Sequence, residues 1–189
     1  MLEYIRENNI AQYKGIPGVW ILLGKEKADT HFVCLQVGQT KDIGNEIKTN
    51  ISYLGKQNFE PTTKKYVNQF GEFMFSYEEH IDERRKMLYG DIAKKYVDLT
   101  FVCITSGEEL KNQVELLKAI EKYVAYKTSC RYWVNGGPYR DGKASEKIEE
   151  IKNDCTNKCG ELFETIKKDY PGKADPLKKL EEFLAQLID

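Results

Sequence analysis

The sequence predicts an α/β (α+β) protein in which helices flank a small, mainly antiparallel sheet of three strands. Runs of β-branched, aromatic and other apolar residues predict the strands, at 19–23, 31–37 and 99–105. Elsewhere, apolar residues recur every three or four positions, a pattern typical of amphipathic helices. The charged segment 25–30 resembles a hairpin connection, so we expect the first two strands to be antiparallel neighbours.

Length and composition indicate one globular domain with additions. A chain of 189 residues is long enough for one hydrophobic core but short for two full domains. We expect the domain to occupy residues 1–140, with an insertion at about 55–97, and residues 141–189 to form a helical extension that packs on it. No apolar run is long enough to cross a membrane and the N-terminus lacks a secretory pattern, so we expect a cytoplasmic protein with no membrane contact.

The remaining elements of the first half follow in chain order. The first 14 residues predict a short polar helix that ends at a Gly-Ile-Pro-Gly turn. A helix should begin at Asp42, because apolar residues recur at helical spacing from Ile43 onward. The aromatic-rich start of the insertion predicts a strand or an extended loop, and a helix is expected over 81–95.

Three helices are expected in the second half of the chain. Their predicted ranges are 108–126, 145–168 and 176–187, the last with Asp175 as N-cap and Pro176 as first helical residue. The last two helices carry apolar stripes that should pack on the domain. In part these stripes could also form a homodimer face or bind a protein partner.

Five cysteines, an odd number, are scattered along the chain and predict reduced thiols. Cys155 and Cys159 share one face of a predicted helix, but no histidine or second cysteine pair stands nearby to complete a zinc site. We interpret this pair as structural rather than as metal ligands.

Glu121 is the most informative single residue in the sequence. At 100° per residue it falls in the middle of the apolar stripe formed by Leu110, Val114, Leu117 and Val124. Removing a carboxylate from water is costly unless it is paired, hydrogen-bonded or bound to a metal. Two interpretations stay open: Glu121 is a functional carboxylate, or the stripe opens at its end and Glu121 meets solvent or an arginine.

A second candidate region runs from Lys122 to Arg140, where basic side chains alternate with aromatic ones and no acidic residue occurs. Such a mixture can hold phosphates and stack bases. The candidate contacts for DNA or RNA are Lys122, Lys127, Arg131, Trp133 and Arg140. The same aromatic residues pack equally well on a sheet, and with a net charge of -1 any basic surplus must be local.

The order of these features resembles that of GIY-YIG nuclease domains. The order is a strand with Gly18-Val19-Trp20, a hairpin, a strand ending in Val37-Gly38-Gln39-Thr40, a helix, another strand, a helix with Glu121 and a turn with Asn135. In that family two signature tripeptides end adjacent strands, the first helix carries an arginine, and a later helix carries a glutamate that holds a divalent metal. The resemblance covers roughly residues 16–137.

Three of the five family positions differ in this chain. Trp20 and Gln36 stand where the family has tyrosines, and Glu46 stands where it has the helix arginine. Glu121 and Asn135 remain, and the resemblance makes Glu121 the implied ligand of Mg²⁺ or another divalent metal. Cleavage by the family's mechanism should fail here, because the proton relay is missing and a phosphate-binding cation is replaced by an anion.

The resemblance therefore implies a catalytically degenerate nuclease-like domain that binds nucleic acid or a protein. The alternative is a divergent but active metal-dependent endonuclease of the restriction type, a hydrolase in which tyrosines of the insertion such as Tyr66 or Tyr77 replace the missing ones. An unrelated α/β fold is also compatible with the same order of elements.

Overall fold

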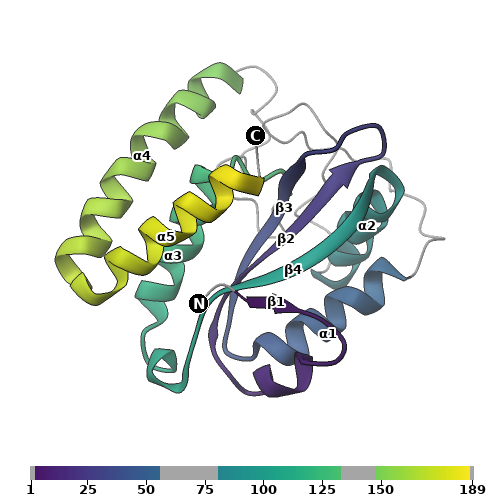
Figure 1. Ribbon diagram of the computed structural model, residues 1–189, viewed down its shortest axis with the longest axis horizontal. Helices are drawn as coiled ribbons and strands as arrows, with labels where there is room; N and C mark the ends of the chain where they lie inside the picture. Colours follow the sequence, from purple (N-terminus) through teal and green to yellow (C-terminus); the bar gives the residue numbers. More distant parts are fainter. Residues whose placement is uncertain (1–2, 56–80, 133–147, 188–189) are drawn as a thin grey trace.

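A four-stranded sheet lies at the centre of the computed structural model, which describes residues 3–55, 81–132 and 148–187 (Figure 1). The strand order is β1-β4-β2-β3, and every neighbouring pair is antiparallel. The strands are β1 (Glu3–Ile5), β2 (Gly18–Glu26), β3 (Phe32–Thr40) and β4 (Tyr96–Ser106). The predicted fold class is confirmed, with one strand more than the three expected.

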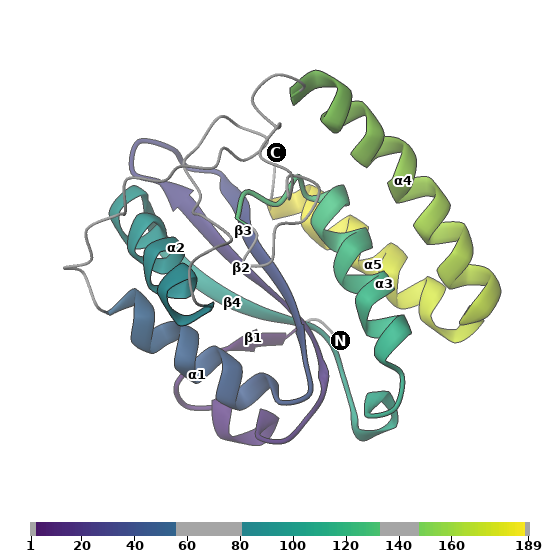
Figure 2. The ribbon, with the colours of Figure 1, turned by 180° about the vertical axis from the view of Figure 1, so that it is seen from behind.

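Helices cover both faces of this sheet, as the opposite views in Figures 1 and 2 show. One face carries α1 (Ile43–Leu54) and α2 (Ile81–Lys95), and the other carries α3 (Val114–Lys127). Two further helices, α4 (Ile148–Asp169) and α5 (Pro171–Leu187), follow, and α4 packs on both α3 and α5. Helices on both faces explain why the sequence of β2 is a continuous apolar run, because every residue from Gly18 to Gly24 is buried.

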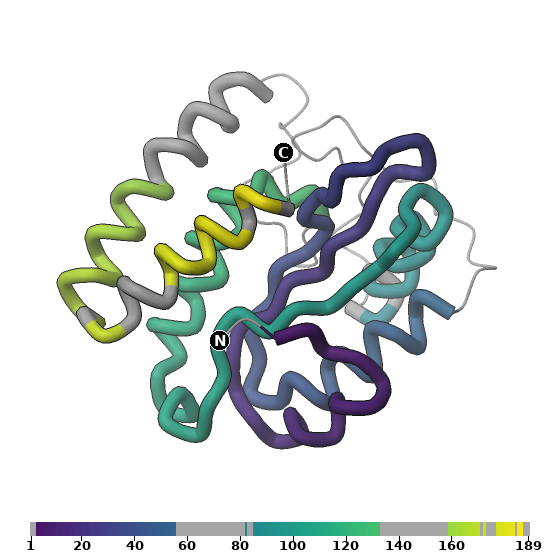
Figure 3. The backbone as a smooth tube through the Cα atoms, in the orientation of Figure 1, coloured from purple at the N-terminus to yellow at the C-terminus, as the bar shows by residue number. Residues whose placement is uncertain are grey.

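The N-terminal segment differs from the prediction of a polar helix over the first 14 residues. Residues 3–5 form β1, which pairs with β4 through Glu3 opposite Cys103, and the side chain of Ile5 is buried. A short 3-10 helix, η1 (Ile10–Tyr13), follows, as the trace in Figure 3 shows. The local pattern is weak in this segment, and pairing with the outer edge of β4, a contact distant in sequence, decides its conformation.

Two predicted helix starts are also wrong. The helix expected from Glu108 begins at Val114, after a 3-10 helix, η2 (Glu108–Leu110). The last helix begins at Pro171 and not at Pro176, so Asp175 lies inside the helix and is not its N-cap. Pro171 suits a first helical position as well as Pro176 does, and the sequence signal did not distinguish them.

Two apolar clusters form the core, one on each side of the sheet. Val19, Ile21 and Leu23 of β2 face α3, whereas Trp20 and Leu22 face α1 and α2. The C-terminal helices share the first cluster, because Cys159, Ile166, Leu177 and Leu180 are buried in it with side chains of α3. The helical extension therefore packs on the sheet domain through apolar contacts.

Two further predictions concern the oxidation state of the cysteines and the absence of membrane-spanning helices. Cys34, Cys103, Cys130 and Cys159 are buried free thiols, which confirms the prediction of reduced cysteines for these four. The side chain of Cys155 lies outside the described set. Among the helices of the described residues, none combines the length and the apolar composition that crossing a bilayer requires.

Candidate functional site

Trp20, the first position that the resemblance assigns to a tyrosine, is fully buried in β2. Its indole lies against Gly38, its partner across the β2–β3 pair, where an added Cβ would come within 2.4 Å of the ring. The ring also meets Phe101 edge-on, with 5.5 Å between the two centroids. Its N–H has no hydrogen-bond partner in the described part of the chain. Trp20 thus fills the core and offers no group to a substrate.

Gln36, the second tyrosine position, is also buried, in β3. Leu22 pairs with Gln36 and Leu23 with Cys34, so Leu35 is an extra residue at a β-bulge. The hydroxyl of Tyr89 on α2 donates to Oε1 of Gln36 at 2.5 Å. Gln36 is therefore held by an internal hydrogen bond rather than directed at solvent.

Removing the hydroxyl of Tyr89 should destabilise the fold. Tyr89→Phe leaves Oε1 of Gln36 buried without this donor, and we expect the free energy of unfolding to fall by about 1–3 kcal/mol in urea unfolding. The double variant Tyr89→Phe/Gln36→Met removes both partners and should recover most of that loss. Equal losses in the single and double variants would show that the hydrogen bond contributes little.

Glu46, at the family's arginine position, is half-buried on α1. Burial raises the pKa of Glu46 above its usual range, while a hydrogen bond with the Thr40 side chain and the charge of Arg85 act against that rise. Arg85 comes from α2, one turn before Tyr89. The arginine whose charge acts on Glu46 therefore belongs to α2, within the insertion, whereas the family has its arginine on the first helix.

Glu121 lies on the flank of the buried face of α3, not at its centre. The expected stripe was misplaced because Val114 is 37% exposed, whereas Leu116 and Ile120 are buried. The side chain of Glu121 is half-buried, and it accepts a hydrogen bond from the backbone N–H of Gln39. Burial, with a further contribution from the charge of Glu46, raises the pKa of Glu121 to about 7.

The two carboxylates approach each other at the outer edge of the sheet. β3 is an edge strand of the described sheet, and there Glu121 accepts from the backbone N–H of Gln39 from the α3 side. Glu46 reaches Thr40, the next residue, from the α1 side. The end of β3 therefore brings together Gln36, Glu46 and Glu121 near Tyr89 and Arg85, two α2 residues that we did not single out from the sequence.

This arrangement provides two oxygen donors for a divalent cation. Mg²⁺ is commonly bound by one or two carboxylates with water filling the other positions, so Glu46 and Glu121 have suitable chemistry. The described residues contain no group of three or more His, Cys, Asp or Glu side chains placed to hold a metal. Asn135, the fifth family position, lies outside the described residues.

The region expected to contact nucleic acid is less basic at its surface than its sequence suggested. Arg131 forms a 2.5 Å ion pair with Glu26, donates to the Tyr96 hydroxyl at 2.7 Å, and is only 15% exposed. Lys127 forms a 3.2 Å ion pair with Glu181. Lys122 is exposed and has no ion pair in the described part. Trp133 and Arg140 lie outside the described residues.

Comparisons with known proteins do not assign this chain to a family. A scan against protein-family models finds no match to this chain, and searches of the curated proteins and of the solved structures find no similar protein. The resemblance therefore rests on the residues themselves and on the order of the elements that carry them.

Proposed function

We propose that this chain is a catalytically degenerate nuclease-like domain that binds nucleic acid without cutting it. The observation that carries the proposal is the burial of Trp20 and Gln36 at the positions where the resemblance would place the reactive tyrosines. A group that moves protons for an attacking water must reach the substrate. Trp20 packs on Gly38 and Gln36 bonds Tyr89, so neither side chain is free for that role.

DNA or RNA is the ligand class that we propose. The C-terminal half of α3 presents Lys122 and Lys127 beside the half-buried ring of Tyr126, and mixed basic and aromatic surfaces suit sugar-phosphate chains and bases. With few cations available, the affinity should be modest. A protein partner becomes the better candidate if no nucleic acid binds.

Gel-shift assays on labelled single- and double-stranded DNA and RNA test this proposal. We expect complexes that weaken as salt is raised, because lysine contacts release counterions from the phosphates. The recovered nucleic acid should be intact, whether Mg²⁺ or EDTA is present. Absence of binding to all four substrates at low salt would refute the proposal.

An active metal-dependent endonuclease is the second candidate, and the pairing of Glu46 with Glu121 favours it. Two carboxylates with raised pKa values gain from a divalent cation that neutralises them. If the pair binds metal, Mn²⁺ should raise the melting temperature of the native chain but not of Glu46→Gln/Glu121→Gln. An unchanged melting temperature in the native chain would count against the metal site and this candidate.

A further inference from the structure

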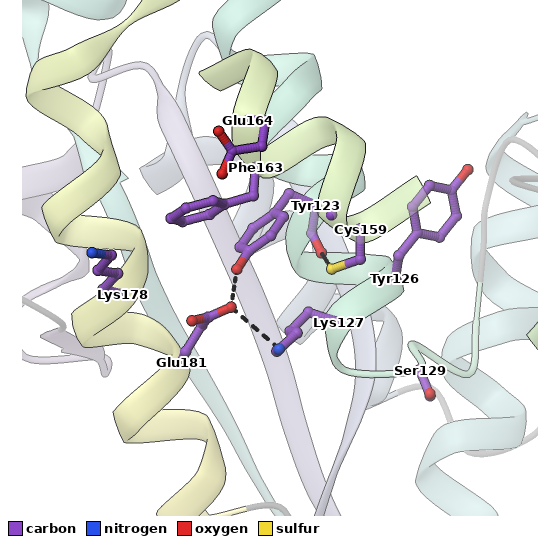
Figure 4. Close-up of a pocket in the computed structure, with 10 residues that line it drawn as sticks. Tyr123, Tyr126, Lys127, Ser129, Cys159, Phe163, Glu164, Lys178 and Glu181 are labelled. Carbon is purple, nitrogen blue, oxygen red and sulfur yellow. Dashed lines mark hydrogen bonds and ion pairs between the residues drawn. The ribbon is translucent and has the colours of Figure 1, made fainter. Parts of the chain in front are cut away.

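A cleft of about 720 Å³ lies between α3 and the C-terminal helices (Figure 4). Side chains of α3, α4 and α5 line it, so the cleft exists only because the helical extension packs against α3. Ligand pockets for small molecules typically enclose roughly 300–1,000 Å³. The cleft therefore has the size of a small-molecule site, and it lies on the opposite side of the sheet from α1 and Glu46.

A network of polar side chains fixes one wall of the cleft. Glu181 of α5 reaches across to α3, where Oε1 accepts hydrogen bonds from the Tyr123 hydroxyl and from Lys127 Nζ, the latter at 3.2 Å (Figure 4). The other oxygen, Oε2, has no partner within the described residues. Glu181 is thus held in place, and among the described residues its Oε2 is left to accept from hydroxyl or amino groups of a ligand.

Aromatic rings form the apolar part of the cleft. Phe163 of α4 is half-buried, with its centroid 5.7 Å from that of Tyr123, and Tyr126 lines the cleft from the end of α3. An added Cβ at Gly160 would meet no atom within 4 Å, so the wall is open beside these rings. A flat ring system such as a nucleobase could enter and stack there.

Lys178 supplies a cation to the wall of the cleft. It is exposed on α5, lines the cleft one turn before Glu181, and has no ion pair in the described part of the chain. An ammonium group on the wall of a cleft that also carries aromatic rings is suited to a phosphate attached to a base.

We propose that this cleft binds a nucleotide, with the phosphate at Lys178, the base against Phe163 or Tyr126, and a sugar hydroxyl or base amino group at Glu181. The inference rests on the proposed function, because it names where a nucleic acid would be recognised. A free nucleotide and one nucleotide of a single strand present the same groups, and the experiment separates these sources.

The test compares neighbouring lysines on α5. Lys178→Ala changes a cleft residue, whereas Lys179→Ala changes a neighbouring exposed lysine that does not line the cleft. Fluorescence anisotropy with a labelled single-stranded oligonucleotide should show a several-fold weaker affinity for Lys178→Ala and a salt dependence lower by about one charge, with little change for Lys179→Ala. Phe163→Leu keeps an apolar side chain but removes the ring, and it should weaken binding by about tenfold. Melting curves check that each variant is folded.

Nucleoside monophosphates provide the second arm. If they compete with the oligonucleotide, a free nucleotide is sufficient; if the variants weaken oligonucleotide binding without such competition, the cleft recognises a strand. If Lys178→Ala and Phe163→Leu leave oligonucleotide binding unchanged, the cleft is not the binding site, although the protein still binds nucleic acid. If only free nucleotides bind, the cleft remains a nucleotide site but the proposed function is refuted. If neither nucleotides nor oligonucleotides bind, both the cleft proposal and the proposed function are refuted.

Discussion

Trp20→Ala should lower the free energy of unfolding by about 3–5 kcal/mol, the usual range for removing a fully buried tryptophan. The loss combines the apolar contacts of the indole with the cavity left between Gly38, Phe101 and the α1 side of the core. For a domain of ordinary stability this is a large fraction of the total. Urea unfolding measures it, and the slope with urea should change little.

Trp20→Phe is the matched control, because it keeps a ring against Phe101 and should lose less than the alanine variant. Val114→Ala, at an exposed position on α3, should cost within about half a kcal/mol. A Trp20→Ala variant as stable as Val114→Ala would contradict the structural role of Trp20 and reopen its position as part of a reactive site.

Glu121→Gln should stabilise the protein above neutral pH. The pKa of Glu121 is raised from 4.5 to about 7, so between these values the folded chain binds more protons than the unfolded chain. The free energy of unfolding of the native protein therefore decreases as pH rises through this window. At 1.36 kcal/mol per pKa unit the full effect is at most about 3 kcal/mol, reached above pH 7.

The glutamine variant removes this titration while its carbonyl oxygen can still accept from the N–H of Gln39. Its free energy of unfolding should vary less with pH between about 5 and 8. Glu115→Gln changes a carboxylate of α3 that is 79% exposed, and it should retain the native pH dependence. Equal slopes for Glu121→Gln and the native chain would show that Glu121 is not held in an unfavourable environment.

The strong strands and helices could be predicted from periodicity, since local and tertiary preferences agree there. The helix over 81–95 and the strand around 99–105 are examples, and both lie where the sequence placed them. β1 could not be predicted, because its conformation depends on pairing with Glu3 opposite Cys103, about 100 residues away. The predicted start of the last helix was wrong because Pro171 and Pro176 carry the same local signal.

For the candidate site, the sequence identified the carboxylates but not their surroundings. Glu46 and Glu121 stood out by position, and both have raised pKa values. Tyr89 and Arg85 were missed, because an amphipathic pattern shows that a helix packs but not which of its polar residues meet another helix. Their one-turn spacing on α2 was the available signal. Pairing of Arg131 with Glu26 was equally hidden, since those residues are distant in sequence.

Loss of nuclease activity is tested most directly by a cleavage assay with the protein in excess over labelled single- and double-stranded DNA and RNA, in Mg²⁺ or Mn²⁺. The native chain and Glu121→Ala are compared over long incubations, with EDTA as the background. Our prediction is that neither protein gives product above the background. Metal-dependent product from the native chain that is lost in Glu121→Ala would contradict it and establish an active nuclease site at the end of β3.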